Sequence, residues 1–316
     1  MKKYFKYHTT ILLFIIFLSE MTFGQSSVAI TIDDVPNTSK YQKDNFQSIL
    51  LNKLDSLNIP VAIFITGDLV YKGDSTAKNF ALLNNWLKRS YTTIGYHTFR
   101  HSRYSEVELN AFKRDVERGL DTLRKLAGKY GKTITYFRFP FNDLGKDSIQ
   151  HTDVVRYICS TKFTIAPFTI ESVDWMFSYI YEYYLGRKDT VKAHEIAMEY
   201  ISKTLEYFDF FDSLALKKYG RPIKQIYLCH DNTINADYLP QLLNELKKKK
   251  YIFISFKEAL KDNVYQQEDT YYKKWGISWV YRWMKNQEEI KSISMHEPED
   301  DLYNLYQQLV KEKKKE

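Results

Sequence analysis

The feature that most constrains the fold is an alternation of short apolar runs with longer amphipathic stretches. The run at 162–168 is the weakest strand prediction of the set, because Pro167 interrupts it. Amphipathic helices are expected between the runs, as at 44–58 and 105–128. This alternation predicts a parallel sheet or barrel. Seven runs are expected to be buried strands, at 27–32, 61–66, 92–96, 133–139, 162–168, 224–230 and 251–256.

The helix expected at 105–128 carries signals at both ends. Ser105 is placed to cap its start, with Glu108 at the capping-box position, and Gly128 is placed to end it. Residues 176–222 form a Tyr- and Phe-rich insertion that we also expect to be helical. Its sequence HEIAM resembles the zinc motif HExxH, but a methionine stands in place of the second histidine, so we expect an ordinary amphipathic helix.

The chain begins with the three-part pattern of a secretory signal peptide. Lys2, Lys3 and Lys6 precede an apolar run at 11–18, and small or polar residues lead to a predicted cut before Gln25. We therefore expect a periplasmic or secreted protein without stable membrane insertion after cleavage. An uncleaved N-terminal anchor is the alternative, because Phe and Ile extend the apolar run.

Composition supports a folded, exported domain. The chain is 44% hydrophobic and 27% charged, enough apolar material for a core. Removing 1–24 takes away three lysines and one glutamate from a net charge of +7, so the remaining charge is mild. Basic residues gather at 247–250 and 311–316, where solvated helix faces explain them, and no nucleic-acid partner is expected. Cys159 and Cys229 are expected to be buried free thiols, with a disulfide as the alternative.

Polar side chains stand where four of the expected strands end. Asp33 and Asp34 follow the first run, His97 follows the third, and Arg138 and His230 lie at the ends of the fourth and sixth. Parallel α/β folds place their chemistry at the carboxyl ends of strands. The adjacent aspartates would face opposite ways on a regular strand, so the chain must turn to bring both into one site. A simple turn is the alternative, since DDVPN has strong turn composition.

A metal site is the chemistry that these residues suggest. His97 and His101, four residues apart, need a third ligand, and one of the two aspartates can supply it. Two imidazoles and a carboxylate suit Zn²⁺ with a position left for water. The second aspartate is then free to accept a proton, and His230 is placed to donate one to a leaving group.

Five motifs in series resemble the polysaccharide deacetylase family (NodB homology domain, carbohydrate esterase family 4). They read TIDD at 31–34, HTFRH at 97–101, RFPF at 138–141, DW at 174–175 and LCH at 228–230. The resemblance covers about residues 28–260 and implies an α/β fold, a distorted (β/α)7-type barrel. We expect this domain at 25–261, followed by a helical C-terminal extension at 262–316.

The resemblance implies a role for each residue of the metal half of the site. Asp33 would be the general base, paired with Arg138, which keeps it ionised and aimed. Asp34, His97 and His101 would bind a divalent metal, usually Zn²⁺, with Co²⁺ or Ni²⁺ as alternatives.

The same resemblance assigns the acid and the pocket. His230 would be the general acid, with Asp174 holding its ring and favouring its protonated form. Trp175 and Leu228 would line the pocket for the acetyl methyl group, and the backbone N–H of Phe141 would help to stabilise the oxyanion.

Two features outside the motifs bear on substrate choice. Phe141 and Asn142 stand where the family more often has Tyr and Gly, and the Asn142 side chain is expected at the groove. Trp275, Trp279 and Trp283, at steps of four, are expected to align on one helix face and pack against the barrel, with a sugar-stacking platform as the alternative.

The sequence therefore predicts an exported, metal-dependent hydrolase that removes acetyl groups from a glycan. Peptidoglycan, chitin-like oligomers and acetylated xylan all fit, and the residues do not separate N- from O-deacetylation. One rival is a related amidohydrolase acting on a small amide or cyclic imide. Another is a non-catalytic glycan-binding protein.

Overall fold

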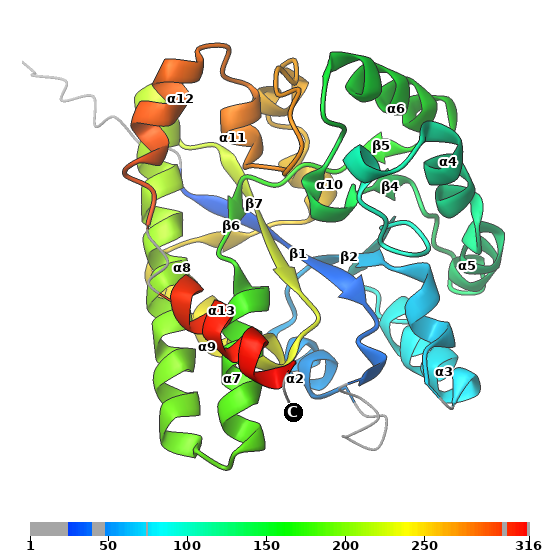
Figure 1. Ribbon diagram of the computed structural model, residues 1–316, viewed down its shortest axis with the longest axis vertical. Coiled ribbons are helices and arrows are strands. Elements are labelled where there is room, and N and C mark those ends of the chain that lie inside the picture. The colour runs from blue at the N-terminus through cyan, green and yellow to red at the C-terminus, as the bar shows by residue number, and fades with distance from the viewer. Residues whose placement is uncertain (1–24, 40–47, 74, 299–301, 315–316) are drawn as a thin grey trace, which may run out of the picture.

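The computed structural model describes residues 25–39, 48–73, 75–298 and 302–314 (Figure 1). The expected signal peptide at 1–24 lies outside the described residues. The strands are β1 Ser27–Val35, β2 Val61–Ile65, β3 Thr92–Tyr96, β4 Tyr136–Phe137, β5 Thr164–Ile165, β6 Ile170–Glu171, β7 Lys224–His230 and β8 Ile252–Phe253. The helices are α2 Ile49–Leu57, α3 Thr76–Leu87, α4 Leu109–Glu117, α5 Leu120–Gly128, α6 Ser148–Ser160, α7 Asp174–Gly186, α8 Thr190–Tyr219, α9 Thr233–Lys248, α10 Phe256–Ala259, α11 Trp279–Arg282, α12 Gln287–Ser294 and α13 Tyr303–Lys313.

All strand pairs in the described chain are parallel and form one curled sheet. Its order is β5-β4-β3-β2-β1-β7-β6, and β8 pairs with the start of β1. The predicted distorted (β/α)7-type barrel is confirmed, with helices around the sheet and the helical extension packed at its rim (Figure 1). Among the described residues, no helix is both long and apolar enough to cross a bilayer.

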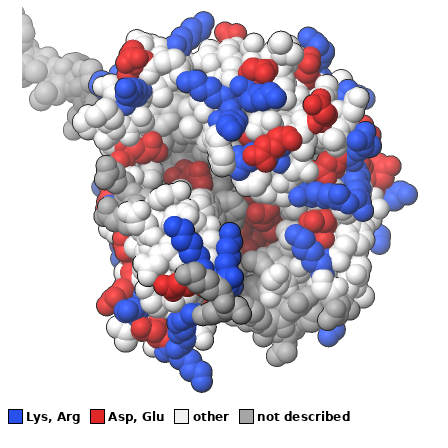
Figure 2. All heavy atoms as spheres, viewed as in Figure 1, with Lys and Arg blue, Asp and Glu red and all other residues white. Residues whose placement is uncertain are grey.

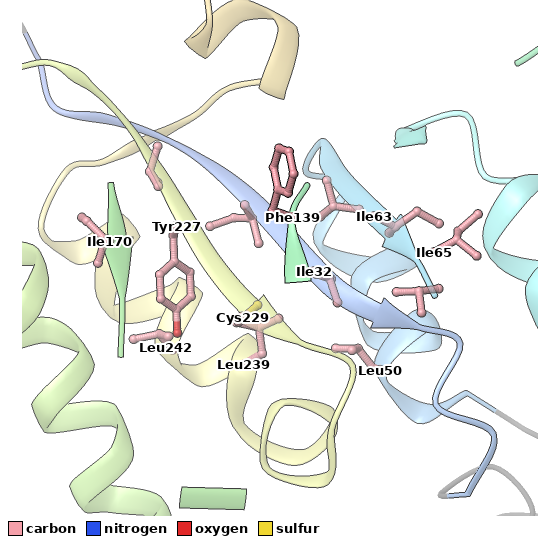
Figure 3. Packing of buried hydrophobic residues seen from close by; sticks show 14 of the residues in the cluster. Ile32, Leu50, Ile63, Ile65, Phe139, Ile170, Tyr227, Cys229, Leu239 and Leu242 are labelled. Atoms are coloured by element: carbon pink, nitrogen blue, oxygen red, sulfur yellow. The ribbon is translucent and has the colours of Figure 1, made fainter. Parts of the chain in front are cut away.

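Alternation along the central strands separates the helix-facing core from the barrel interior. Figure 3 shows Ile32 of β1 and Cys229 of β7 directed toward Leu50 of α2 and Leu239 of α9. Residues of the opposite parity, such as Ala29, belong to a second buried cluster inside the barrel. Successive strand side chains point to opposite faces, so the inward-facing residues near the ends of β1 and β7 lie at the mouth of the barrel.

The sheet remains open between β5 and β6, and the C-terminal extension covers this opening. Residues 166–169 connect the two strands, a connection that the sequence pattern missed because β6 has only two residues and follows Pro167. The Ser278 hydroxyl donates to Thr169 O at 2.6 Å, and Trp279 N–H donates to Phe168 O at 3.0 Å. The extension is therefore bound to the edge of the barrel.

The expected single helix at 105–128 is wrong. Gly119, with a φ of 70°, separates α4 from α5, because a left-handed residue ends the regular helical hydrogen bonding. Ser105 does not cap a helix; its hydroxyl donates to Asp143 Oδ2 at 2.6 Å, and Glu108 stands at the start of α4.

Two further expectations need correction. Cys159 and Cys229 are both free, as expected, but Cys159 is exposed because its side of α6 faces solvent. The three tryptophans do not share one helix face, since α11 spans four residues and Trp275 lies before it with a φ of 70°. Trp279 and Trp283 are buried, whereas Trp275 is exposed.

A glycine in β3 makes room for an aromatic ring that supports the site. Gly95 lies opposite Phe64 in the register of β2 and β3, and a Cβ on Gly95 would lie 2.4 Å from the Phe64 ring. The same ring lies beneath the guanidinium of Arg138, with Cζ 4.2 Å from the ring centroid.

We expect Gly95→Ala to destabilise the fold by about 1–3 kcal/mol, because overpacking forces the buried ring to move. Urea unfolding measures the effect. Gly128→Ala is the matched control, since nothing lies within 4 Å of its added Cβ. Equal unfolding midpoints for the two variants would show that the Phe64 ring yields freely.

Candidate active site

The carboxyl ends of β1 and β7 bring Asp33 and His230 side by side. The two residues are register partners in the parallel pairing of these strands. Ala29, Thr31 and Asp33 are alternate residues of β1, so their side chains all face the barrel interior. The Asp33 carboxylate therefore lies where this interior opens at the barrel mouth. Asp33 is 2% exposed, which makes it a buried acid at the floor of the site.

A bulge at the end of β1 directs Asp34 into the same site. Between Ile32 and Val35 the register with β2 slips, because β1 advances three residues while β2 advances two. Asp34 takes a φ of 59°, so both adjacent carboxylates face the barrel mouth instead of opposite sides. The Thr66 hydroxyl, at the end of β2, donates to Asp34 Oδ1 at 2.7 Å and orients it.

The two histidines lie in the loop after β3, not on a helix. His97 Nδ1 lies 2.8 Å from the carbonyl oxygen of Arg138, to which it can only donate, so Nε2 carries the lone pair. His101, with a φ of 58°, turns back so that its Nε2 lies 3.1 Å from that of His97. Thr98 Oγ1 accepts the His101 N–H at 3.0 Å and holds this turn.

Asp34, His97 and His101 form a set of donors suited to a divalent cation. Their ligand atoms all lie within 4.8 Å of one another. Burial lowers the pKa of each histidine to about 4, which leaves both imidazoles neutral near pH 7. Burial alone would raise the pKa of Asp34, but the neighbouring histidines and the Thr66 hydroxyl lower it to about 2. Two neutral imidazoles beside one carboxylate fit Zn²⁺.

Arg138 is the buried counter-ion of Asp33. Its Nη1 lies 3.0 Å from Asp33 Oδ1 and 2.7 Å from Thr31 Oγ1, while Nη2 donates to Pro167 O at 3.0 Å. With 1% exposure, this pair is not a surface salt bridge. Burial raises the pKa of the Asp33 carboxyl, and Arg138 opposes that rise. The result is a buried carboxylate that is more basic than one in water.

A second buried carboxylate, that of Asp174, orients His230. Asp174, fully buried at the first turn of α7, contacts His230 Nδ1 at 2.7 Å and accepts its backbone N–H at 2.8 Å. The side chains of Asn232 and Asn235 also donate to Asp174. Burial lowers the pKa of His230, but the carboxylates of Asp174, Asp34 and Asp33 outweigh it and raise this pKa to about 10. The imidazole is therefore protonated near neutral pH.

These groups share one cleft of about 560 Å³. Figure 2 shows the hollow on this face with acidic side chains inside it and most lysines and arginines around it. Leu228 and Trp175 line this cleft together with His230. Tyr306 of the extension packs against Trp175, with ring centroids 5.4 Å apart, and Trp275 of the extension also lines the cleft. All ten residues that the sequence predicts for the site are thus brought together, at or beside the cleft.

Sequence reasoning missed Thr66, Asn235 and Glu171. Thr66 and Asn235 act through hydrogen bonds to Asp34 and Asp174, and single polar residues carry no pattern that reveals such contacts. Glu171 lines the cleft three residues before Asp174, and burial raises its pKa to about 7.

Asn142 lies at the cleft, where its side chain was expected, but its amide hydrogen-bonds to the C-terminal extension. It is 6% exposed, because its Nδ2 donates to Ile277 O at 2.8 Å and its Oδ1 accepts from Trp279 Nε1 at 3.0 Å. The residue that departs from the family pattern thus binds the extension.

Comparison with known proteins agrees with the motifs. The family model described as polysaccharide deacetylase matches residues 20–157, which contain the first three motifs. A curated peptidoglycan-N-acetylglucosamine deacetylase of Bacillus cereus is 23% identical over 153 residues, 48% of this chain and 48% of that protein. The chain thus spans about half the length of the curated relative it matches.

Solved structures resemble this chain at low sequence identity. A mutant of a carbohydrate esterase family 4 pseudoenzyme, with restored enzymatic activity, has a TM-score of 0.50 at 14% identity and covers 75% of this chain and 68% of that one. A peptidoglycan N-acetylglucosamine deacetylase has a TM-score of 0.49 at 17% identity and covers 75% and 89%. The resemblance to the polysaccharide deacetylase family, with its NodB homology domain, is confirmed.

We expect the protein to bind Zn²⁺, with His101→Ala weakening the affinity by more than ~100-fold, because a ligand matters more than the outer contacts that typically change it 10–100-fold. Titration calorimetry on chelator-treated protein measures this. His194→Ala, an exposed histidine of α8, is the control and should bind like the wild type. Equal affinity for His101→Ala would contradict the assigned ligand set.

Proposed function

We propose that the protein is an exported, metal-dependent deacetylase that hydrolyses acetyl groups from an N- or O-acetylated glycan. The observation that carries the proposal is the convergence of two charge pairs, the buried Asp33–Arg138 and the partly buried His230–Asp174, on the Asp34, His97 and His101 set. The family match and the similarity to a peptidoglycan deacetylase support the acetylated glycan as substrate class.

The bases and acids of the site suit hydrolysis of an acetyl group. A divalent cation held by Asp34, His97 and His101 would polarise the acetyl carbonyl and make water more acidic. Asp33 accepts the proton of the attacking water, for which its raised pKa suits it. The water oxygen bonds to the carbonyl carbon, and the bond to the sugar nitrogen or oxygen then breaks.

The leaving group takes its proton from the other wall. His230, protonated through the carboxylates around it, donates to the departing amine or alcohol. Asp174 keeps the ring oriented throughout. Leu228 and Trp175 offer an apolar wall for the methyl group, and the resemblance implies that the Phe141 backbone N–H helps to hold the oxyanion. The products are acetate and a free amino sugar or hydroxyl.

Acetate release from acetylated glycans tests the proposal. We expect the wild type to release acetate, a chelator to abolish the release and Zn²⁺ to restore it. Asp33→Asn should lower kcat by about 10²–10⁴-fold, because proton abstraction is lost, while Zn²⁺ binding remains. Glycan affinity without release would instead indicate a binding protein, and release only from small amides or cyclic imides would indicate an amidohydrolase.

The pH dependence tests the acid. His230 must be protonated to donate, so activity falls as pH rises through its pKa. Removing the Asp174 charge lowers that pKa, so we expect Asp174→Asn to move the alkaline limb of the kcat/KM profile to lower pH.

Asp231→Asn is the matched control for this profile. Asp231 is a buried carboxylate next to His230 in sequence, but it accepts from Asn37 N–H at 2.9 Å. Its substitution should leave the limb in place. If folded Asp174→Asn keeps the alkaline limb of the wild-type kcat/KM profile, His230 is not the general acid.

A further inference from the structure

Trp275 has a backbone that its surroundings hold in an unusual conformation. A φ of 70° is rare for a large aromatic residue and persists only where neighbours enforce it. The Tyr271 hydroxyl donates to Trp275 O at 2.7 Å, and the next residue, Gly276, donates its N–H to Phe141 O at 3.1 Å. The side chain nevertheless remains 56% exposed.

The segment around Trp275 is clamped to the loop that follows β4. A Cβ on Gly276 would lie 2.3 Å from Asn142 Cβ, so the two backbones are in close contact. Both polar atoms of the Asn142 side chain bind this segment, and the Arg282 guanidinium donates to Asn142 O at 3.2 Å. Trp275 therefore stands on a fixed support and not on a free loop.

A series of contacting side chains connects Trp275 to His101. The Arg103 guanidinium lies between two rings, with Cζ 3.9 Å from the Trp275 centroid and 3.7 Å from that of Phe141. The Phe141 ring centroid in turn lies 4.6 Å from that of His101. Only the Arg103 and Phe141 side chains thus separate the Trp275 indole from His101 in this series of contacts.

Packing does not account for the exposure of Trp275. Trp279 and Trp283, in the same segment, are 8% and 6% exposed and pack the extension onto the barrel. Trp275 instead lines the cleft together with Trp175 and Tyr306. Rigid aromatic surfaces with polar neighbours are typical of sites that bind the apolar C–H face of a sugar ring.

We propose that Trp275 is a sugar-stacking residue that binds a pyranose ring of the acetylated glycan beside the sugar that is deacetylated. The proposal rests on the proposed function and specifies where the rest of the chain of sugars lies. The C-terminal extension then supplies the subsite, and Asn142 and Arg103 position it. Recognition here extends beyond one sugar residue, so an oligomer binds better than a monomer.

Binding and turnover of tetra-N-acetylchitotetraose test this subsite. We expect Trp275→Ala to raise KM and weaken the calorimetric affinity by ~10-fold, with kcat changed less than ~2-fold and Zn²⁺ affinity retained. Trp275→Phe keeps a ring and should recover most of the affinity. Tyr303→Ala is the matched control: an aromatic residue of the extension with 55% exposure that does not line the cleft.

Three results would overturn the subsite. One is a tetramer affinity and KM for Trp275→Ala equal to those of the wild type. Another is a loss confined to kcat and Zn²⁺ affinity, which would make the indole a support for His101. The third is a failure of Trp275→Phe to recover more affinity than Trp275→Ala. If the wild type releases no acetate, the proposed function fails, but the calorimetric comparison still tests the subsite. A weaker tetramer affinity of Trp275→Ala than of the wild type then supports the subsite. Equal affinity, or no binding by either protein, rejects it.

Discussion

The site depends on one extra residue at the end of β1. The bulge between Ile32 and Val35 turns Asp34 into a left-handed conformation, so two consecutive carboxylates face the same space. A regular strand would send one of them to the helix-facing core, where an unpaired charge is costly. Because of the bulge, one carboxylate joins the two histidines and the other meets Arg138, so the proposed metal binding and the proposed proton transfer fall to separate carboxylates.

Burial also sets different protonation states for the charged groups, because each buried charge has its own partner. Asp33 of β1 has Arg138, and His230 of β7 has Asp174 of α7. The same burial that raises the pKa of Asp33 lowers those of His97 and His101. His230 is kept protonated and the imidazoles of His97 and His101 neutral within one cleft, a combination that solvent-exposed side chains would not maintain.

The extension belongs to the site because the barrel is open. Residues 166–169 leave a gap between β5 and β6, and Ser278 and Trp279 of the extension hydrogen-bond to this connection. Asn142, in a left-handed conformation that glycine would adopt more easily, is stabilised there by its contacts with the extension. Asn142, which departs from the family pattern, and the added C-terminal extension thus contact each other.

The amino-acid sequence alone determined the parallel α/β class and the identity of the chemical groups, because strand periodicity and the motif residues are local signals that survive without coordinates. It predicted β1, β2, β3 and β7 well, since these are the longest strands of the sheet. Only the tertiary structure decided the two-residue β6, the break at Gly119, the hydrogen bonds from Thr66 and Asn235, and the direction of Trp275. These depend on contacts between residues far apart in the chain, and the pattern of a single segment does not specify its distant partners.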